Sequence, residues 1–140
     1  MSKLLSPTAR RQKGFTLIEL LIVIAIIGIL ALIILLALMN ARRKGQDAKI
    51  KSDVEQCRTQ AEVIADNSNG SYAGATTADA SIAAMSVDAS TQGTALGISA
   101  WTSGYKYSGR MRSDTATQYC VDSTGNAYTG TAMAAGATCQ

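Results

Sequence analysis

Glu19 is the residue whose place in the chain most suggests a chemical role. Its carboxyl group comes directly before twenty consecutive uncharged residues, Leu20–Met39, nearly all of them Leu, Ile, Val or Ala. About twenty apolar residues can cross a bilayer as a helix, and an acid in such a segment is rare and indicates function. The alternative is a glutamate at the membrane interface, where hydration makes the charge tolerable. The residues alone leave both interpretations open.

The residue types that catalysis usually needs are scarce. The chain has no histidine, which excludes His-based triads and His metal sites. We find no nucleophile–base pair, metal cluster or phosphate loop in the sequence, so we expect neither an enzyme nor a cofactor. Asp122 begins a Gly-containing turn that could bind calcium, but an EF-hand ligand set is absent and such an Asp is usually a turn residue. A membrane-anchored enzyme or binding domain is therefore a remote alternative.

Positive charge is concentrated near the start of the chain. The formal net charge is +3, and the first fourteen residues contain four Lys or Arg and no acid. Without them the net charge would be −1 (+3 minus +4), so the balance does not argue for nucleic-acid binding. Residues 42–44 are also basic, so the positive-inside rule gives nearly a tie and does not set the orientation.

The segment from Lys13 to Glu19 gives a more specific signal. Its sequence, KGFTLIE, follows a basic leader and precedes the apolar run, and it closely resembles the class III signal of type IV prepilins and pseudopilins. The resemblance implies cleavage between Gly14 and Phe15 by a membrane prepilin peptidase, which also methylates the new N-terminus at Phe15. It further implies that Glu19 pairs with the N-terminal amine of a neighbouring subunit, and that the leader is cytoplasmic and the C-terminal domain outside.

We expect four parts along the chain. Residues 1–14 would be the cytoplasmic leader, 15–39 a transmembrane or filament-core helix, 40–66 its amphipathic continuation, and 67–140 a small globular head. The first helical part departs from the family in one respect. Many type IVa pilins carry a proline about two-thirds through this span, whereas this chain has Leu36 there.

Apolar and small residues recur along the second half of the expected helix, at spacings of 4, 3, 4 and 3 that place them on one face. This helix stripe consists of Ile50, Val54, Cys57, Ala61 and Ile64. Charged residues occupy the other faces, where we expect i,i+4 ion pairs such as Asp47–Lys51. The stripe should supply the core that the head lacks, because a short domain with few large apolar residues buries too little surface alone.

The head carries three short strand signals. They are Tyr105–Ser108, Thr117–Val121 and Ala127–Thr129, the last after a turn at 122–126. A short helix is expected over 78–87, with Ile82 and Met85 inward, and the rest of 71–100 is expected to be loop. The fold class is therefore α+β, a long N-terminal helix packed against an antiparallel sheet of three or four strands. The pilin family's fold implies the same arrangement.

Three cysteines in a chain with an export signal predict one disulfide and one odd thiol. In type IV pilins a C-terminal disulfide often closes this region, and the resemblance implies the pair Cys120–Cys139. Cys57 would then be a buried thiol. The rival pair Cys57–Cys120 would join the sheet to the helix and stays open at this point.

The resemblance implies a structural subunit of a type IV pilus that serves adhesion, surface motility or DNA uptake. Its partners would be further copies of itself in a helical homopolymer, the prepilin peptidase, the pilus assembly platform and minor pilins. The precursor would be a single-pass protein of the cytoplasmic membrane and the mature subunit part of an extracellular filament. A pseudopilin of a type II secretion or competence system is the alternative within the same structural class.

Overall fold

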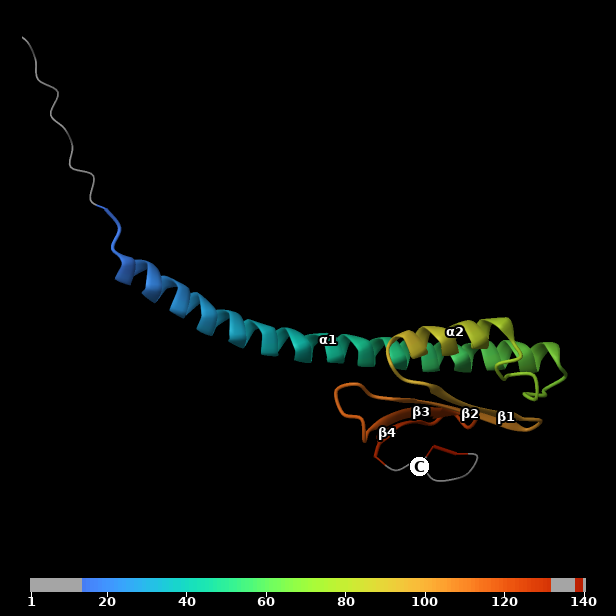
Figure 1. Ribbon diagram of the computed structural model, residues 1–140. Coiled ribbons are helices and arrows are strands. Elements are labelled where there is room, and N and C mark those ends of the chain that lie inside the picture. The colour runs from blue at the N-terminus through green and yellow to red at the C-terminus, as the bar shows by residue number, and fades with distance from the viewer. Residues whose placement is uncertain (1–13, 132–137, 140) are drawn as a thin grey trace, which may run out of the picture. The chain divides into compact units, whose positions relative to one another are not determined.

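The computed structural model describes residues 14–131, 138 and 139 of the chain. In these residues the elements are α1 (Leu17–Asn67), α2 (Ala80–Thr91), β1 (Leu96–Trp101), β2 (Gly104–Arg110), β3 (Gln118–Asp122) and β4 (Ala127–Gly130), as Figure 1 shows. The expected α+β class is confirmed. The chain divides into two compact units, Met1–Ala37 and Leu38–Gln140.

Helix α1 is 51 residues long and runs without a break through Leu36, the place where many relatives would have a proline. No proline follows residue 7, so no residue after it lacks the N–H that each helical turn needs. The helix ends where Asn69 and Gly70 take positive φ angles of 52° and 84°. The Gly70 N–H donates to the Ala65 carbonyl at 2.8 Å, which closes the last turn in the manner of a Schellman motif.

The four strands form one antiparallel sheet in the order β1-β2-β3-β4, so each strand pairs with the next one along the chain. Strand β1 was not expected, because residues 71–100 were predicted to be loop outside one short helix. That helix is also longer than expected. Asp79 caps α2 by accepting from the backbone N–H groups of Ser81 and Ile82, at 2.9 and 3.1 Å, and Ile82 is buried as predicted.

The core of the second unit lies between the second half of α1 and the sheet. Four members of the helix stripe (Ile50, Val54, Cys57 and Ala61) are fully buried, which confirms the prediction, and Ile64 is partly buried. Tyr105 and Tyr107 of β2 face them, with stacked rings 5.0 Å apart. Gly109 brings β2 close to the helix, since a Cβ there would lie 2.5 Å from the Ile50 Cγ2 atom.

Candidate processing and assembly segment

Gly14 and Phe15, the predicted cleavage pair, lie directly before α1 and are exposed. A Cβ added to Gly14 would meet nothing within 4 Å, so no contact within this chain requires glycine there. Phe15 is 77% exposed. The pair is therefore accessible to an enzyme, and a glycine without a side chain lets another protein approach its backbone closely.

Glu19 and Thr16 form a capping box at the start of α1. The Glu19 Oε2 atom accepts from the Thr16 backbone N–H at 2.9 Å and from the Thr16 hydroxyl at 2.8 Å. The Glu19 N–H donates to the Thr16 hydroxyl oxygen at 3.3 Å. The pattern Thr-x-x-Glu before an apolar run is a known helix start, so the sequence held this signal although our prediction did not use it. The box fixes the place of the Glu19 carboxylate relative to Phe15.

The first half of α1 exposes almost all of its apolar side chains. From Leu17 to Met39 the large apolar residues are between 46% and 81% exposed. Among the described residues, α1 is a helix long and apolar enough to cross a membrane, judged by length and composition. Apolar surface of this extent on a chain indicates a covering partner, which can be lipid or other protein.

Three carboxylates on the second half of α1 accept hydrogen bonds from the head, whereas Asp53 forms an i,i+4 ion pair with Lys49 along the helix, the kind of pair that was predicted. Asp47 accepts from the backbone N–H groups of Arg112 and Ser113, the latter at 3.2 Å, where an Asp47–Lys51 pair was expected. Glu55 accepts from the Tyr119 hydroxyl, and the Lys51 Nζ atom lies 5.4 Å from the centre of the Tyr119 ring. Buried donors of the sheet and its loops thus satisfy these acids.

Glu62 makes a third such contact, near the end of α1. Its two oxygens accept from the hydroxyls of Tyr72 at 2.9 Å and Tyr105 at 2.8 Å. Burial, with the Glu62 carboxylate beside it, raises the pKa of Tyr105 well above its usual value. The hydroxyl therefore remains a donor throughout the physiological range.

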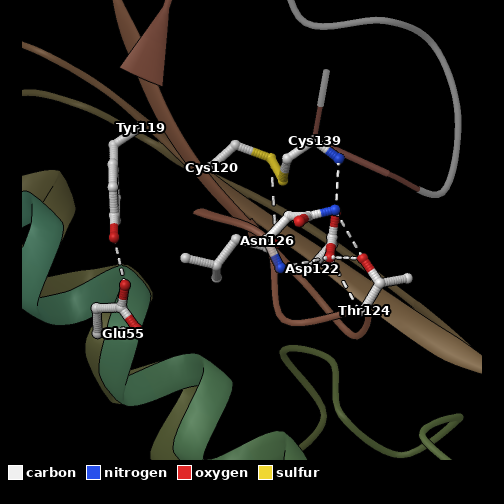
Figure 2. Close-up of a disulfide and its surroundings, with 8 residues drawn as sticks. Glu55, Tyr119, Cys120, Asp122, Thr124, Asn126 and Cys139 are labelled. Atoms are coloured by element: carbon white, nitrogen blue, oxygen red, sulfur yellow. Dashed lines mark hydrogen bonds between the residues drawn. A yellow bond between two sulfur atoms is a disulfide. The ribbon is translucent and has the colours of Figure 1, made fainter. Parts of the chain in front are cut away.

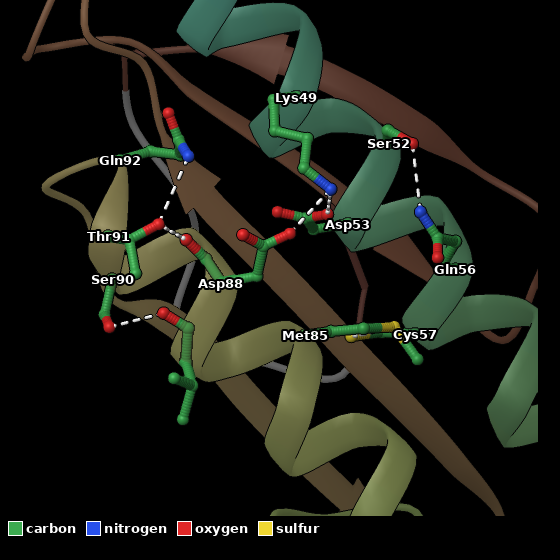
Figure 3. A network of polar contacts seen from close by, with 11 residues as sticks. Lys49, Ser52, Asp53, Gln56, Cys57, Met85, Asp88, Ser90, Thr91 and Gln92 are labelled. Atoms are coloured by element: carbon green, nitrogen blue, oxygen red, sulfur yellow. Dashed lines mark hydrogen bonds and ion pairs between the residues drawn. The ribbon is translucent and has the colours of Figure 1, made fainter.

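Lys49 joins α1 to α2 in the same unit. Its Nζ atom lies 3.0 Å from Asp53 Oδ1 and 2.6 Å from Asp88 Oδ2, as Figure 3 shows. Asp53 is almost fully buried, and the lysine supplies the charge partner that a buried carboxylate needs. One turn further, the Cys57 thiol is 3.6 Å from the Met85 sulfur, and burial raises the pKa of this thiol to about 12.

The structure joins Cys120 to Cys139 in a disulfide, and Cys57 is a buried free thiol (Figure 2). Asp122 lies beside the bridge and is fully buried. Its carboxylate accepts from the backbone N–H of Cys139 at 2.7 Å and from the backbone and hydroxyl of Thr124 at 2.9 and 2.6 Å. The Asn126 N–H adds a fourth bond at 3.2 Å. These donors turn toward the carboxylate, so Asp122 is a turn residue here, which favours that interpretation over calcium.

The described residues contain no group of three or more His, Cys, Asp or Glu side chains that could hold a metal ion.

Comparison with known proteins gives one family model and several relatives that match part of this chain. Residues 9–35 match the prokaryotic N-terminal methylation motif. The type IV major fimbrial protein FimA of Dichelobacter nodosus is 51% identical over 51 residues, which are 36% of this chain and 33% of the relative. The type IV wide pilus major component PilA4 of Thermus thermophilus is 56% identical over 41 residues, 29% of this chain and 31% of the relative. No solved structure matches the chain significantly.

A pseudopilin is also among the relatives. The type II secretion system core protein G of Dickeya chrysanthemi is 41% identical over 51 residues, 36% of this chain and 33% of the relative. The matched part thus spans about a third of the length of each of these relatives. These matches show a similarity to type IV pilins and pseudopilins over 29–36% of this chain, and the methylation motif agrees with it.

Proposed function

We propose that this chain is the precursor of a structural subunit of a type IV pilus, polymerised through the first half of α1. The main support for this proposal is that two features, a methylation motif and an exposed apolar helix face, occur in the same N-terminal segment. The methylation motif covers residues 9–35, and the large apolar side chains of the first half of α1, most of them within this motif, are exposed. A membrane would cover this surface in the precursor, and the helices of other copies would cover it in a filament.

Processing would occur between Gly14 and Phe15, by a prepilin peptidase that also methylates the new Phe15 amine. Before cleavage the Phe15 nitrogen is an uncharged amide. Afterwards it carries a positive charge at the start of a long apolar helix. The leader would be on the cytoplasmic side and the head outside, and the partners would be further copies, minor pilins and the assembly platform.

Glu19 would receive the Phe15 amine of a neighbouring copy. Both bonds that the Glu19 carboxylate accepts reach Oε2, so Oε1 is able to accept from another subunit. Between packed apolar helices an unpaired carboxylate is costly, and an opposite charge relieves the cost. Register would follow, because only one stagger of the helices places an amine at each Glu19.

The test is expression of the full chain in cells with and without a prepilin peptidase, followed by mass spectrometry of the mature N-terminus. We expect a product that begins with N-methyl-Phe15 only when the peptidase is present, and sheared filaments that contain it. An intact N-terminus in both strains, or a cut near Ala41, would contradict the proposal and indicate an ordinary anchor or secretory signal.

A pseudopilin of a type II secretion or competence system is the second candidate. The match to the core protein G of Dickeya chrysanthemi over 51 residues favours it. Both candidates predict the same cleavage, so the length of the filaments distinguishes them. Long surface filaments at natural expression levels support the pilus subunit, and short ones confined to the envelope support the pseudopilin.

A further inference from the structure

Two arginines line an open cleft on the head. This cleft lies outside the processing and assembly segment. The cleft, of about 480 Å³, lies among the α2–β1 connection, the start of β1, the end of β2 and the loop that leads to β3. Arg110 and Arg112 line it, together with polar side chains including Thr115 and Gln118. The head, residues 67–140, has three basic residues in all, so two of the three are in this cleft.

Arg112 is incompletely satisfied. Its Nη1 atom donates to the Gly93 carbonyl at 3.1 Å, but its Nε atom is buried and has no hydrogen-bond partner among the described residues. Because the Nε atom is buried, it is out of reach of an acceptor on another molecule, and only the exposed part of the guanidinium is able to bind one. An arginine fork is suited to a carboxylate, which can accept two parallel N–H bonds.

The head's own acids are already engaged elsewhere. Asp79 caps α2, Asp88 pairs with Lys49, Asp114 accepts from Ala116 and Thr117, and Asp122 accepts four donors beside the disulfide. These four are all the acids after residue 67. In the contacts of the described residues, none of these four side chains binds the guanidinium of Arg110 or Arg112.

The opposite end of the same unit presents exposed negative charge. Asp66 is exposed in the last turn of α1 and lines a shallow pocket with Glu62, Asn69 and Gly70. Both Glu62 oxygens are held by tyrosine hydroxyls, which leaves Asp66 as the acid that is able to bind a partner.

The two charged surfaces are too far apart to meet within one chain. Asp47 binds the Arg112 backbone, so the arginine cleft lies beside residue 47 of α1, whereas Asp66 is nineteen residues further along the helix. At 1.5 Å per residue the separation along the axis is about 28 Å. Surfaces of opposite charge at opposite ends make a head-to-tail contact between copies, and such contacts build open helical filaments.

We propose that the cleft of Arg110 and Arg112 binds the Asp66 end of a second copy of this chain. The contact would be a head-to-tail interface between the globular parts of neighbouring copies along the filament, separate from the apolar helix core. It rests on the proposed filament function and adds a charge-specific contact that sets which heads are neighbours. Such complementarity gives specificity and register more than affinity.

A charge exchange in the full chain tests the proposal. Arg110→Glu and Asp66→Arg each place like charges together, and the double variant restores opposite ones. Both residues are exposed, so the head should keep its fold, which thermal unfolding checks. We expect each single variant to lower the yield of sheared filaments by roughly tenfold or more and the double variant to recover most of it. Val87→Glu adds charge at an exposed site of α2 and should have little effect.

Disulfide trapping provides an independent measurement. Arg110→Cys combined with Asp66→Cys should give covalent multimers in oxidised filaments, and neither single variant should do so. Wild-type yields from both charge variants, failure of the double variant to recover, or absence of multimers would each overturn the interface. All of these outcomes leave cleavage at Phe15 and filament formation by the wild type intact. Absence of wild-type filaments would instead refute the proposed function and the interface with it.

Discussion

The two halves of α1 form one continuous helix but have opposite relations to their surroundings. In the first half, up to Ala37, the large apolar side chains are exposed and Glu19 bonds with its neighbour Thr16. In the second half, one stripe is buried under the sheet and three carboxylates bind groups of the head. This chain therefore leaves the apolar surface of the first half uncovered and buries the stripe of the second half. Assembly and folding should respond to different residues for this reason.

Glu19→Ala should have the largest effect, and only on assembly. Removal of the carboxylate leaves the amine of a neighbouring subunit without a partner, so we expect filament yield to fall below detection while cleavage at Phe15 continues. Mass spectrometry of the N-terminus and electron microscopy of sheared material measure the two effects separately. Val63→Ala, at an exposed site of the second half, should show normal filaments in the same measurements. Normal filament yield from Glu19→Ala would show that the first half does not depend on this charge.

The same change, Ile to Ala, can be made once in each half of α1, as Ile33→Ala in the first half and Ile50→Ala in the second. Ile50 is fully buried and Ile33 is 60% exposed. The first change removes buried methyl groups and leaves a cavity, which typically lowers the free energy of unfolding by about 2–5 kcal/mol. The second should leave the unfolding of the head unchanged. Chemical denaturation of the full chain in detergent, followed by tryptophan fluorescence of Trp101, measures both, and equal effects would contradict the division of α1.

Loss of the disulfide should lower the free energy of unfolding of the head by as much as Ile50→Ala does, or by less. Cys120 and Cys139 are 19 residues apart, and closing a loop of that size lowers unfolded-state entropy by an amount worth about 3 kcal/mol. We expect the Cys120→Ser, Cys139→Ser double variant to show this loss in the free energy of unfolding. Cys57→Ala is the control, because it should retain the disulfide in a thiol count of the unfolded protein. Loss of the disulfide in Cys57→Ala would instead support a Cys57–Cys120 pair.

Substitution of Asp122 should lower the free energy of unfolding by a smaller amount, and this amount should depend on pH. Burial raises the pKa of its carboxyl, but the hydrogen bonds from Cys139, Thr124 and Asn126 together outweigh burial and lower the pKa below the usual 3.8. A carboxyl with a lowered folded pKa adds stability above pH 3.8, and this stability is lost as the pH falls through the folded pKa.

Asp122→Asn should therefore lower the free energy of unfolding at pH 7 by about 1–3 kcal/mol, the cost of leaving buried donors poorly satisfied. The difference from wild type should shrink as the pH falls toward 2. Asp66→Asn, at an exposed site, should show no such trend. A difference for Asp122→Asn that is independent of pH would mean that its charge does not stabilise the turn.

Several expectations failed for one physical reason. Strand β1 was missed because its partly buried residues, Leu96, Ile98 and Ala100, alternate with Gly and Ser in a segment whose composition resembles a loop. The register with β2 stabilises it, and that pairing is a property of another segment. The Asp47–Lys51 pair was wrong for a similar reason, because the N–H groups that hold Asp47 belong to residues more than sixty positions away.

Features that depend on neighbouring residues could be predicted from the amino-acid order. The prepilin-type signal, the uninterrupted helix, the burial of Ile50, Val54, Cys57 and Ala61, and the α+β class all follow from local order, spacing and composition. Only the tertiary structure decided which groups the helix carboxylates bind, that Asp122 is surrounded by donors, and that the cleft of Arg110 and Arg112 lies near one end of the unit. Helix periodicity identifies a buried face because it repeats every few residues. Partners of polar groups depend on contacts between distant segments, which no local pattern records.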